Sequence, residues 1–132
     1  MIAKKFILAD NAIFTVSNVK TGNRFTYKIT TPKGKEAPHF VKVLTGPNNY
    51  DDYQYLGVIQ DRQKYYHGKK SSISPNAPSA KAFEWFWSNL DRLPECIEVR
   101  HEGKCGMCGK KLTTPESIET GIGPVCMQKL GE

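Results

Sequence analysis

The amino-acid sequence predicts an α+β fold: an antiparallel β-sheet packed by one amphipathic helix over residues 1–95, followed by a small cysteine-rich module over residues 96–132. Three observations support this prediction. Strand-like segments fill the first two thirds of the chain, and residues 24–30 alternate with the two-residue period of a half-buried strand. A later segment repeats its apolar residues with the 3.6-residue period of a helix. Cysteines and turn-forming glycines then gather near the C-terminus.

The sheet is expected to contain several short strands. The clearest is the segment 24–30, in which Phe25, Tyr27 and Ile29 would lie on one face and polar residues on the other. A Gly-containing connection at residues 20–23 suits a hairpin with the preceding strand. The predicted strands are residues 12–17, 24–30, 39–45, 53–60 and the shorter segments 64–67 and 96–101.

One long helix is expected over residues 79–93, after a linker that is rich in Ser, Pro and Asn. Ser79 can cap its start, and Pro94 stops it. Trp85 lies off the apolar stripe, where it either covers a second packing contact or stacks on a base or a partner. The stripe itself, which we expect to pack on the sheet, consists of Phe83, Phe86, Trp87, Leu90 and Leu93.

The C-terminal cysteines have the spacing of a metal site. Cys105 and Cys108 form a Cys-x-x-Cys pair on a Gly-containing turn, which lets both sulfurs point to one side. Cys126 follows a Gly-Pro sequence and is expected in the first turn of a short helix over residues 124–130. Zn2+ prefers four thiolate or imidazole ligands. We therefore expect one structural zinc ion in a small zinc-knuckle or treble-clef-like module.

Two residues compete to be the fourth zinc ligand. His101 is separated from Cys105 by three residues, and a turn at Gly103 would bring it over the metal. Cys96 is the alternative fourth ligand. In an extended strand Cys96 and His101 face opposite sides, because their spacing is odd. We favour His101, which leaves Cys96 as a small buried apolar residue.

Other uses of the cysteines fit the sequence less well. A redox Cys-x-x-Cys pair would follow a strand at a helix N-terminus, without a third cysteine that competes for it. A disulfide would need an oxidising compartment. A catalytic zinc of the deaminase type would show His-x-Glu before Pro-Cys-x-x-Cys, and here His101 is followed directly by Glu102. The site is therefore expected to be closed and structural.

The positive charge of the chain lies mainly in its first 80 residues. Residues 1–80 carry twelve Lys and Arg against five Asp and Glu, whereas residues 81–132 carry seven against eight. A basic surface favours phosphate-rich partners, although a net charge of this size also serves solubility alone. Cations alternate with aromatic rings at the positions we expect to contact nucleic acid, namely Arg24, Lys28, Lys42, Tyr65, Tyr66, Lys69 and Lys70.

Residues 101–126 resemble a C-terminal domain of unknown function that is widespread in bacteriophages, prophages and actinobacterial proteins. The matching pattern is His-x3-Cys-x2-Cys-Gly, followed by Gly-Ile-Gly-Pro-x-Cys. Residues 22–27, 43–47 and 82–87 look like the N-terminal half that accompanies this domain. The resemblance implies that the cysteine segment binds zinc through His101, Cys105, Cys108 and Cys126. It also implies a setting among nucleic-acid enzymes, because the domain occurs attached to helicase-like proteins.

Two functional hypotheses follow. The first is a small phage-type nucleic-acid-binding accessory protein with a structural zinc. The second is a protein-binding phage factor that inhibits or redirects a host protein, for example in anti-defence. Each would act in the cytoplasm, which is the host cytoplasm for a phage-encoded protein.

Enzymes and membrane proteins fit the sequence poorly. The sequence contains no nucleophile–base pair or carboxylate pair at a spacing typical of catalytic sites, and no phosphate-binding glycine loop. We therefore expect neither an enzyme nor a small-molecule substrate. No apolar stretch approaches the roughly 20 residues of a membrane helix. The apolar run at residues 6–9 is also too short for a secretory signal.

Overall fold

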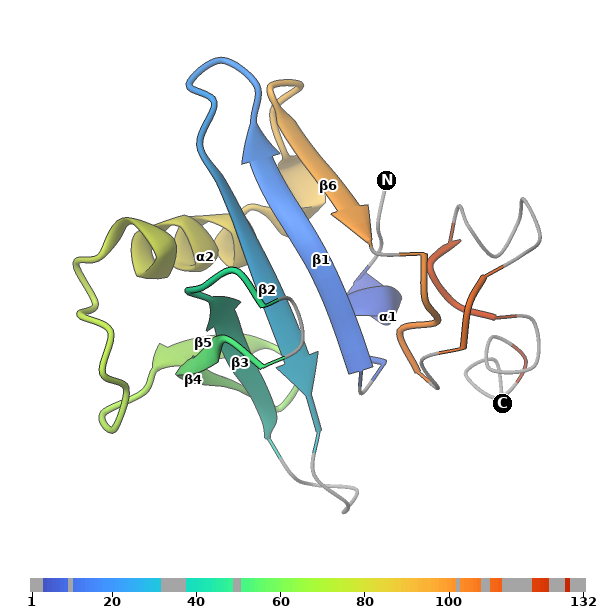
Figure 1. The fold of residues 1–132 in the computed structure, drawn as a ribbon, viewed down its shortest axis with the longest axis horizontal. Helices are drawn as coiled ribbons and strands as arrows, with labels where there is room; N and C mark the ends of the chain where they lie inside the picture. The colour runs from blue at the N-terminus through green and yellow to red at the C-terminus, as the bar shows by residue number, and fades with distance from the viewer. Residues whose placement is uncertain are drawn as a thin grey trace.

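The computed structural model describes residues 4–9, 11–31, 38–48, 51–101, 103–107, 110–112, 120–123 and 128. Its main feature is a six-stranded antiparallel sheet with the strand order β5-β4-β3-β2-β1-β6 (Figure 1). The predicted strands are confirmed to within a residue or two at their ends. They are β1 (Asn11–Asn18), β2 (Arg24–Thr30), β3 (His39–Leu44), β4 (Tyr53–Gln60), β5 (Lys64–His67) and β6 (Ile97–His101).

The last strand corrects the predicted fold class. β6 pairs antiparallel with β1, with Phe14 opposite His101 and Asn18 opposite Ile97. The predicted sequence of a sheet domain and then a zinc-knuckle or treble-clef-like module is therefore wrong. One sheet dominates the described part of the chain, and no group of three metal-ligating side chains occurs within it. The physical reason is that β1 would otherwise present a row of unpaired backbone groups, which β6 satisfies.

The main helix is shorter than the predicted residues 79–93. Its N-cap is Ala77, and Ser79 lies inside the helix instead of capping it. The helix ends where the side-chain amide of Asn89 donates a hydrogen bond to the carbonyl oxygen of Trp85, at 2.8 Å. The helical elements are α1 (Lys4–Ile7), α2 (Pro78–Ser88) and a short 3-10 helix, η1 (Leu90–Arg92).

The core lies between α2 and the sheet, as the apolar stripe predicted. The rings of Phe83 and Tyr27 meet edge to face, with 4.9 Å between their centroids. The Tyr27 hydroxyl donates a hydrogen bond to the carbonyl oxygen of Ser79, at 2.8 Å, which fixes α2 over β2. Trp85 remains 42% exposed, in agreement with its position off the stripe. Of the stripe residues, Leu93 is partly buried and the buried ones are Phe83, Phe86, Trp87 and Leu90.

The short helix α1 adds a second part to the core that the sequence did not predict. Residues 6–9, interpreted from the sequence only as a run too short for a signal, are all buried. The ring of Phe6 packs edge-on against Phe14 of β1, with 6.3 Å between centroids. The imidazole Nε2 of His39 lies 3.3 Å from the carbonyl oxygen of Leu8, so β3 also holds this segment.

Both α-helices pack on the same face of the sheet, and the described residues place no helix on the other. Figure 1 looks onto this second side, with α1 and α2 behind β1 and β2. Cross-strand pairing puts Lys28, Lys42 and Tyr55 in one row on this side, with Phe40 and Tyr66 in the next. We call this side the open face and define it by Lys28, Phe40, Lys42, Tyr53, Tyr55 and Tyr66.

Candidate metal centre and nucleic-acid interface

The C-terminal segment packs around one ring from the start of the chain. A Cβ added to Gly106 or to Gly121 would lie 2.6 Å from a ring carbon of Phe6, so only glycine allows this approach. The Gly106 amide donates a hydrogen bond to the carbonyl oxygen of Gly121, at 2.8 Å. The Asn11 amide donates in turn to the carbonyl oxygen of Gly106, at 2.7 Å. These contacts join the two glycine-containing segments of the cysteine motif to α1 and β1 (Figure 1).

The chain reverses direction around Cys105. Lys104 and Lys111 form an antiparallel bridge. The Cys105 amide donates to the carbonyl oxygen of Lys110, and the Leu112 amide donates to that of Gly103, each at 2.8 Å. The reversal lies where the sequence places the Cys-x-x-Cys turn.

The sulfur of Cys105 sits in an environment suited to a metal ligand. Cys105 is 1% exposed. Its Sγ accepts hydrogen bonds from the backbone amides of Met107, at 3.4 Å, and Gly123, at 3.2 Å. Amide donors stabilise negative charge on sulfur, and the thiolate is the form that binds metal. The Gly123 contact is notable because it comes from the second segment of the motif, three residues before Cys126 in the sequence.

His101 lies at the end of β6, beside the same cluster. Its ring centroid is 5.7 Å from that of Phe6. Its Nδ1 accepts a hydrogen bond from the Gly103 amide, at 2.8 Å. A ring nitrogen that accepts carries no proton, so the proton of the neutral imidazole is on Nε2. Zinc binding through Nε2 would require that proton to move to Nδ1 and the Gly103 hydrogen bond to break.

The other proposed ligands divide between two places. Cys108 and Cys126 lie outside the described residues, as does the predicted helix 124–130 apart from residue 128. Cys96 precedes β6 at the end opposite His101, and its carbonyl oxygen accepts a hydrogen bond from the Val19 amide, at 2.8 Å. A strand of this length spans roughly 16 Å. The structure therefore places His101 and Cys105 at one end of β6 and Cys96 at the other.

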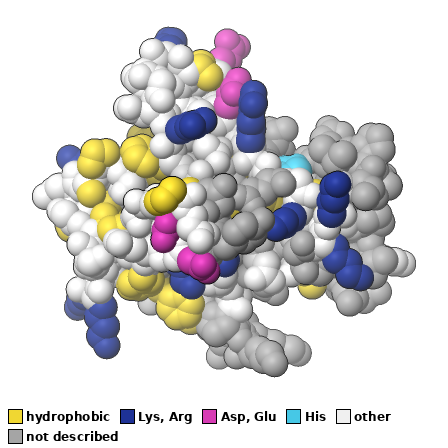
Figure 2. All heavy atoms as spheres, viewed as in Figure 1, with side chains coloured by type: hydrophobic (Ala, Val, Ile, Leu, Met, Phe, Trp, Pro, Cys, Tyr) yellow, Lys and Arg dark blue, Asp and Glu magenta, His cyan; other side chains and the backbone are white. Residues whose placement is uncertain are grey.

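Two of the predicted nucleic-acid-binding lysines lie side by side on the open face. Lys28 of β2 is directly opposite Lys42 of β3. The Nζ atom of Lys28 lies 5.6 Å from the ring centroid of Tyr53, and Lys42 is paired with Tyr55. The ring of Tyr55 meets that of Phe40 edge to face, with 6.1 Å between centroids. Figure 2 shows that Lys and Arg side chains on this side are scattered among hydrophobic and acidic ones.

The remaining predicted contacts do not share one surface. Tyr65 and Tyr66 are neighbours on β5 and point to opposite faces of the sheet. Tyr65 packs against Phe83 with 4.9 Å between centroids, and burial followed by the nearby Glu84 carboxylate raises its pKa. Tyr66 is 48% exposed, on the open face. Arg24 is exposed at the start of β2, and Lys69 and Lys70 are exposed in the turn after β5.

Sequence reasoning missed three aromatic residues of the open face. Phe40, Tyr53 and Tyr55 flank the lysine pair. The alternation of Tyr53 and Tyr55 in the strand 53–60 was a usable signal, because residues two apart in a strand share a face. Their position next to Lys28 and Lys42 depends on the pairing of β3 with β4, which the sequence does not give.

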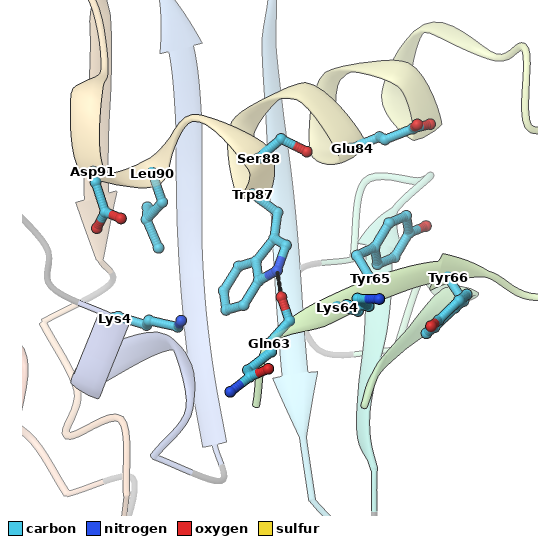
Figure 3. Close-up of a pocket in the computed structure, with 10 residues that line it drawn as sticks. All are labelled: Lys4, Gln63, Lys64, Tyr65, Tyr66, Glu84, Trp87, Ser88, Leu90 and Asp91. Atoms are coloured by element: carbon cyan, nitrogen blue, oxygen red, sulfur yellow. Dashed lines mark hydrogen bonds between the residues drawn. The ribbon is translucent and has the colours of Figure 1, made fainter. Parts of the chain in front are cut away.

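A cavity of about 390 Å³ lies between α1, α2 and the turn that joins β4 to β5 (Figure 3). The Trp87 indole crosses it and donates a hydrogen bond to the carbonyl oxygen of Gln63, at 2.9 Å. The Nζ of Lys4 lies 5.2 Å from the Trp87 ring centroid. Glu84 and Asp91 add acidic groups to the lining. The side chains that line the cavity thus carry both positive and negative charges, so the charge of the lining favours neither an anionic nor a cationic ligand.

A second, more apolar groove of about 420 Å³ lies beside the exposed Trp85. It runs between α2 and the end of the sheet where β6 begins. Its lining includes Val16, Phe25, Pro78, Trp85, Pro94 and Ile97.

Comparison with known proteins gives one match. A family of unknown function (DUF6011) matches residues 98–131, roughly a quarter of the chain, from within β6 through the cysteine motif. The predicted resemblance to a C-terminal domain of unknown function is confirmed at that level. Neither curated proteins nor solved structures yield a match. Among the described residues, no helix is long and apolar enough to cross a membrane.

Proposed function

We propose that this protein binds nucleic acid through the open face of its sheet and that one structural zinc ion holds its C-terminal segment. The observation that carries the first part is the Lys28–Lys42 pair between aromatic rings. Like charges directly opposite on neighbouring strands repel each other. An anion placed between them removes that repulsion, and phosphate is the anion that a basic, ring-bearing surface fits best.

Fluorescence anisotropy with labelled DNA and RNA, over about 50 to 200 mM salt, tests the first part. We expect binding that weakens as salt rises, because counterions are released when lysines neutralise phosphates. Replacing Lys28 and Lys42 together by Gln should weaken binding and make its salt dependence shallower. The double variant Lys20→Gln with Lys81→Gln, which also removes two positive charges but from exposed positions off the open face, is the matched control. Absence of binding at low salt, or equal losses in both variants, would contradict the proposal.

The zinc ion would be held by Cys105, Cys108 and Cys126, with His101 as the fourth ligand. Support comes from the two amide donors on the Cys105 sulfur, one of which belongs to the segment before Cys126. His101 fits only after it exchanges its Gly103 hydrogen bond for the metal. Such an ion would be structural, because four protein ligands leave no position for a reacting water.

Elemental analysis of protein purified without chelators tests the metal. We expect one zinc per chain, and Cys105→Ser or Cys126→Ser should abolish its retention. Cys96→Ser is the matched control, because it changes the same side chain at the far end of β6. His101→Ala should weaken zinc binding but not abolish it. If His101→Ala retains all its zinc, His101 is not a ligand and serves only the turn at Gly103. If the unmodified protein holds no zinc, the proposed site is refuted.

The resemblance to phage and prophage proteins suggests where these two activities would operate. We infer an accessory role beside nucleic-acid enzymes in the cytoplasm, which is the host cytoplasm for a phage-encoded chain. This setting is supported by the resemblance of residues 101–126 to phage and prophage sequences and by the basic N-terminal part of the chain.

A second candidate function is binding of a host protein. The observation in its favour is the apolar groove beside Trp85, because an exposed Trp at the edge of an apolar groove is a common anchor of protein interfaces. Affinity capture from host lysate after nuclease treatment tests it. One stoichiometric protein that is captured by the unmodified chain and lost with Trp85→Ser would favour this function over nucleic-acid binding.

A further inference from the structure

We propose that the nucleic acid bound by the open face is single-stranded, with its bases stacked on Phe40, Tyr53 and Tyr55 and its phosphates beside Lys28 and Lys42. This inference rests on the proposed nucleic-acid-binding function and narrows it to one class of ligand.

The first argument is the arrangement of rings and cations. Tyr53 and Tyr55 are two residues apart on β4, so their side chains lie on one face about 7 Å apart along the strand. Phe40, on the neighbouring strand, meets Tyr55 at 6.1 Å. All three residues are half-buried: the Tyr53 hydroxyl is itself buried, and Gly68 packs closely against the Tyr55 ring. Unpaired bases stack on such rings regardless of sequence, because every base has a π-face.

The second argument concerns where the cations lie relative to the rings. Lys28 and Lys42 occupy the same cross-strand row as Tyr55. The Nζ of Lys28 lies 5.6 Å from the Tyr53 ring centroid. A nucleic-acid strand whose bases cover the rings on β3 and β4 therefore brings its phosphates to the lysines on β2 and β3. The nearby Asp52 carboxylate accepts a hydrogen bond from the Asn48 amide, at 2.8 Å, and is thus engaged within its own turn.

The third argument is that a duplex would leave these rings without a role. Paired bases are stacked inside the helix, and proteins read them by inserting a helix or a β-ribbon into a groove. The rings here lie on one face of β3 and β4, and each of these strands is paired with a neighbouring strand on both sides. Such a face meets a duplex only at its phosphates, whereas splayed bases of a single strand reach the rings directly.

The test compares a labelled strand of about 15 nucleotides with the duplex formed by annealing its complement, at equal salt. DNA and RNA strands are used in parallel arms, since both offer the same stacking chemistry. We expect the single strands to bind at least tenfold more tightly than the duplexes. Tyr55→Leu and Phe40→Leu should each weaken single-strand binding by roughly 5- to 150-fold and leave duplex binding unchanged.

Two controls keep the test interpretable. Tyr55→Phe retains the ring and should bind as the unmodified protein does, so a loss in Tyr55→Leu alone is not a loss of folding. Trp85→Leu removes an exposed ring from the helix side and should have no effect.

The outcomes separate this inference from the function on which it rests. Duplex binding equal to or tighter than single-strand binding, or Leu variants that bind normally, would overturn the inference while nucleic-acid binding stands. If neither strand nor duplex binds at low salt, the proposed function itself fails.

Discussion

At the scale of single residues, the most informative feature is a pair of like charges. Lys28 and Lys42 face each other across β2 and β3 on the open face. Nearby rings offset part of the repulsion, since the Lys28 ammonium lies above Tyr53. An unfavourable pair placed among aromatic side chains is typical of a surface that receives an anion.

The free protein should therefore become more stable when this repulsion is removed. We expect Lys42→Glu to raise the free energy of unfolding by about 0.2–1 kcal/mol, because an opposite-charge cross-strand pair replaces a repulsive one. Urea denaturation measures the change. Lys69→Glu, in an exposed turn, should alter the free energy of unfolding by less than about 0.5 kcal/mol. A destabilised Lys42→Glu would show that the lysines do not repel in the folded state.

Residue-level predictions from the sequence assign side chains to strands, and the structure shows which of those side chains share a face. Lys28 and Lys42 are predicted to contact nucleic acid because their strands also carry aromatic residues, and the structure places the two lysines opposite each other. Tyr65 and Tyr66 were treated as equals, although neighbours in a strand must point to opposite faces. Tyr65 is consequently part of the packing under α2 and Tyr66 is not. Which of the two faces is covered depends on packing between distant segments, which no local pattern contains.

At the scale of elements, the turn between β4 and β5 stands out. Asp61 and Arg62 both have positive φ, at 55° and 58°, although neither is glycine. The Gln63 amide donates to the carbonyl oxygen of Gln60, at 3.0 Å, which closes a β-turn around these two residues within the three-residue connection of β4 to β5. Asn-Gly is the usual solution for such a turn. Here Asp61 and Arg62, which adopt positive φ less readily than Asn-Gly, precede Gln63, whose carbonyl oxygen accepts the hydrogen bond from Trp87.

Replacing Arg62 by Gly should relieve this turn. We expect a gain of up to about 1 kcal/mol in the free energy of unfolding, because a left-handed conformation costs non-glycine residues roughly 1–2 kcal/mol and glycine returns part of it as chain entropy. Thermal unfolding followed by circular dichroism gives the change. The reverse substitution, Gly22→Ala in the turn after β1, should destabilise the protein because its φ is +78°. No gain in Arg62→Gly would mean that the turn carries little strain.

The elements themselves were largely predictable, but their partners were not. Strand-forming composition located β1 to β6, and in β2 a clean two-residue period, typical of a strand with one buried face, supported it. That β6 joins β1 at the edge of the sheet could not be read from the sequence, since pairing depends on backbone groups far apart in the chain. α1 was missed because four helical residues contain barely one turn, too few for a periodic signal.

At the scale of the whole molecule, Phe6 connects the two ends of the described chain. Its ring touches Gly106 and Gly121 on one side and Phe14 and His101 on the other. The C-terminal segment is thus anchored to α1 and β1 by packing as well as by backbone hydrogen bonds. Zinc would add to this anchor, since metal binding in a folded site contributes directly to folding free energy.

Phe6→Ala should therefore be among the most damaging single substitutions. We expect a loss of about 3–5 kcal/mol in the free energy of unfolding, as for other fully buried phenylalanines. Limited trypsin digestion should also show faster cleavage after Lys104, Lys110 and Lys111, because their segment loses its support. Phe40→Ala, at a half-exposed ring, is the control and should cost markedly less. Similar losses in the two variants would mean that Phe6 is not the link described here.

Removal of the proposed zinc ion should affect the same segment first. We expect a chelator to lower the melting temperature and to accelerate trypsin cleavage at residues 104–111, while protection of amides in β2 and β3 against hydrogen exchange persists longer. Cys105 belongs to the same buried core as the residues under α2, but the sheet is also held to α2 by the edge-to-face contact of Tyr27 with Phe83. If a chelator strips all bound zinc and the melting temperature does not change, the ion does not stabilise this fold.

The contact between Phe6 and Gly121 also sets an order for synthesis. Gly121 leaves the ribosome roughly 115 residues after Phe6, which at typical translation speeds is about 6–23 s. Throughout that interval Phe6 can pack on Phe14 of β1, but its ring still lacks the contact with Gly121. Chaperones should therefore bind the first ten residues of a nascent chain that is arrested before residue 120. They should release it only after Gly121 has emerged.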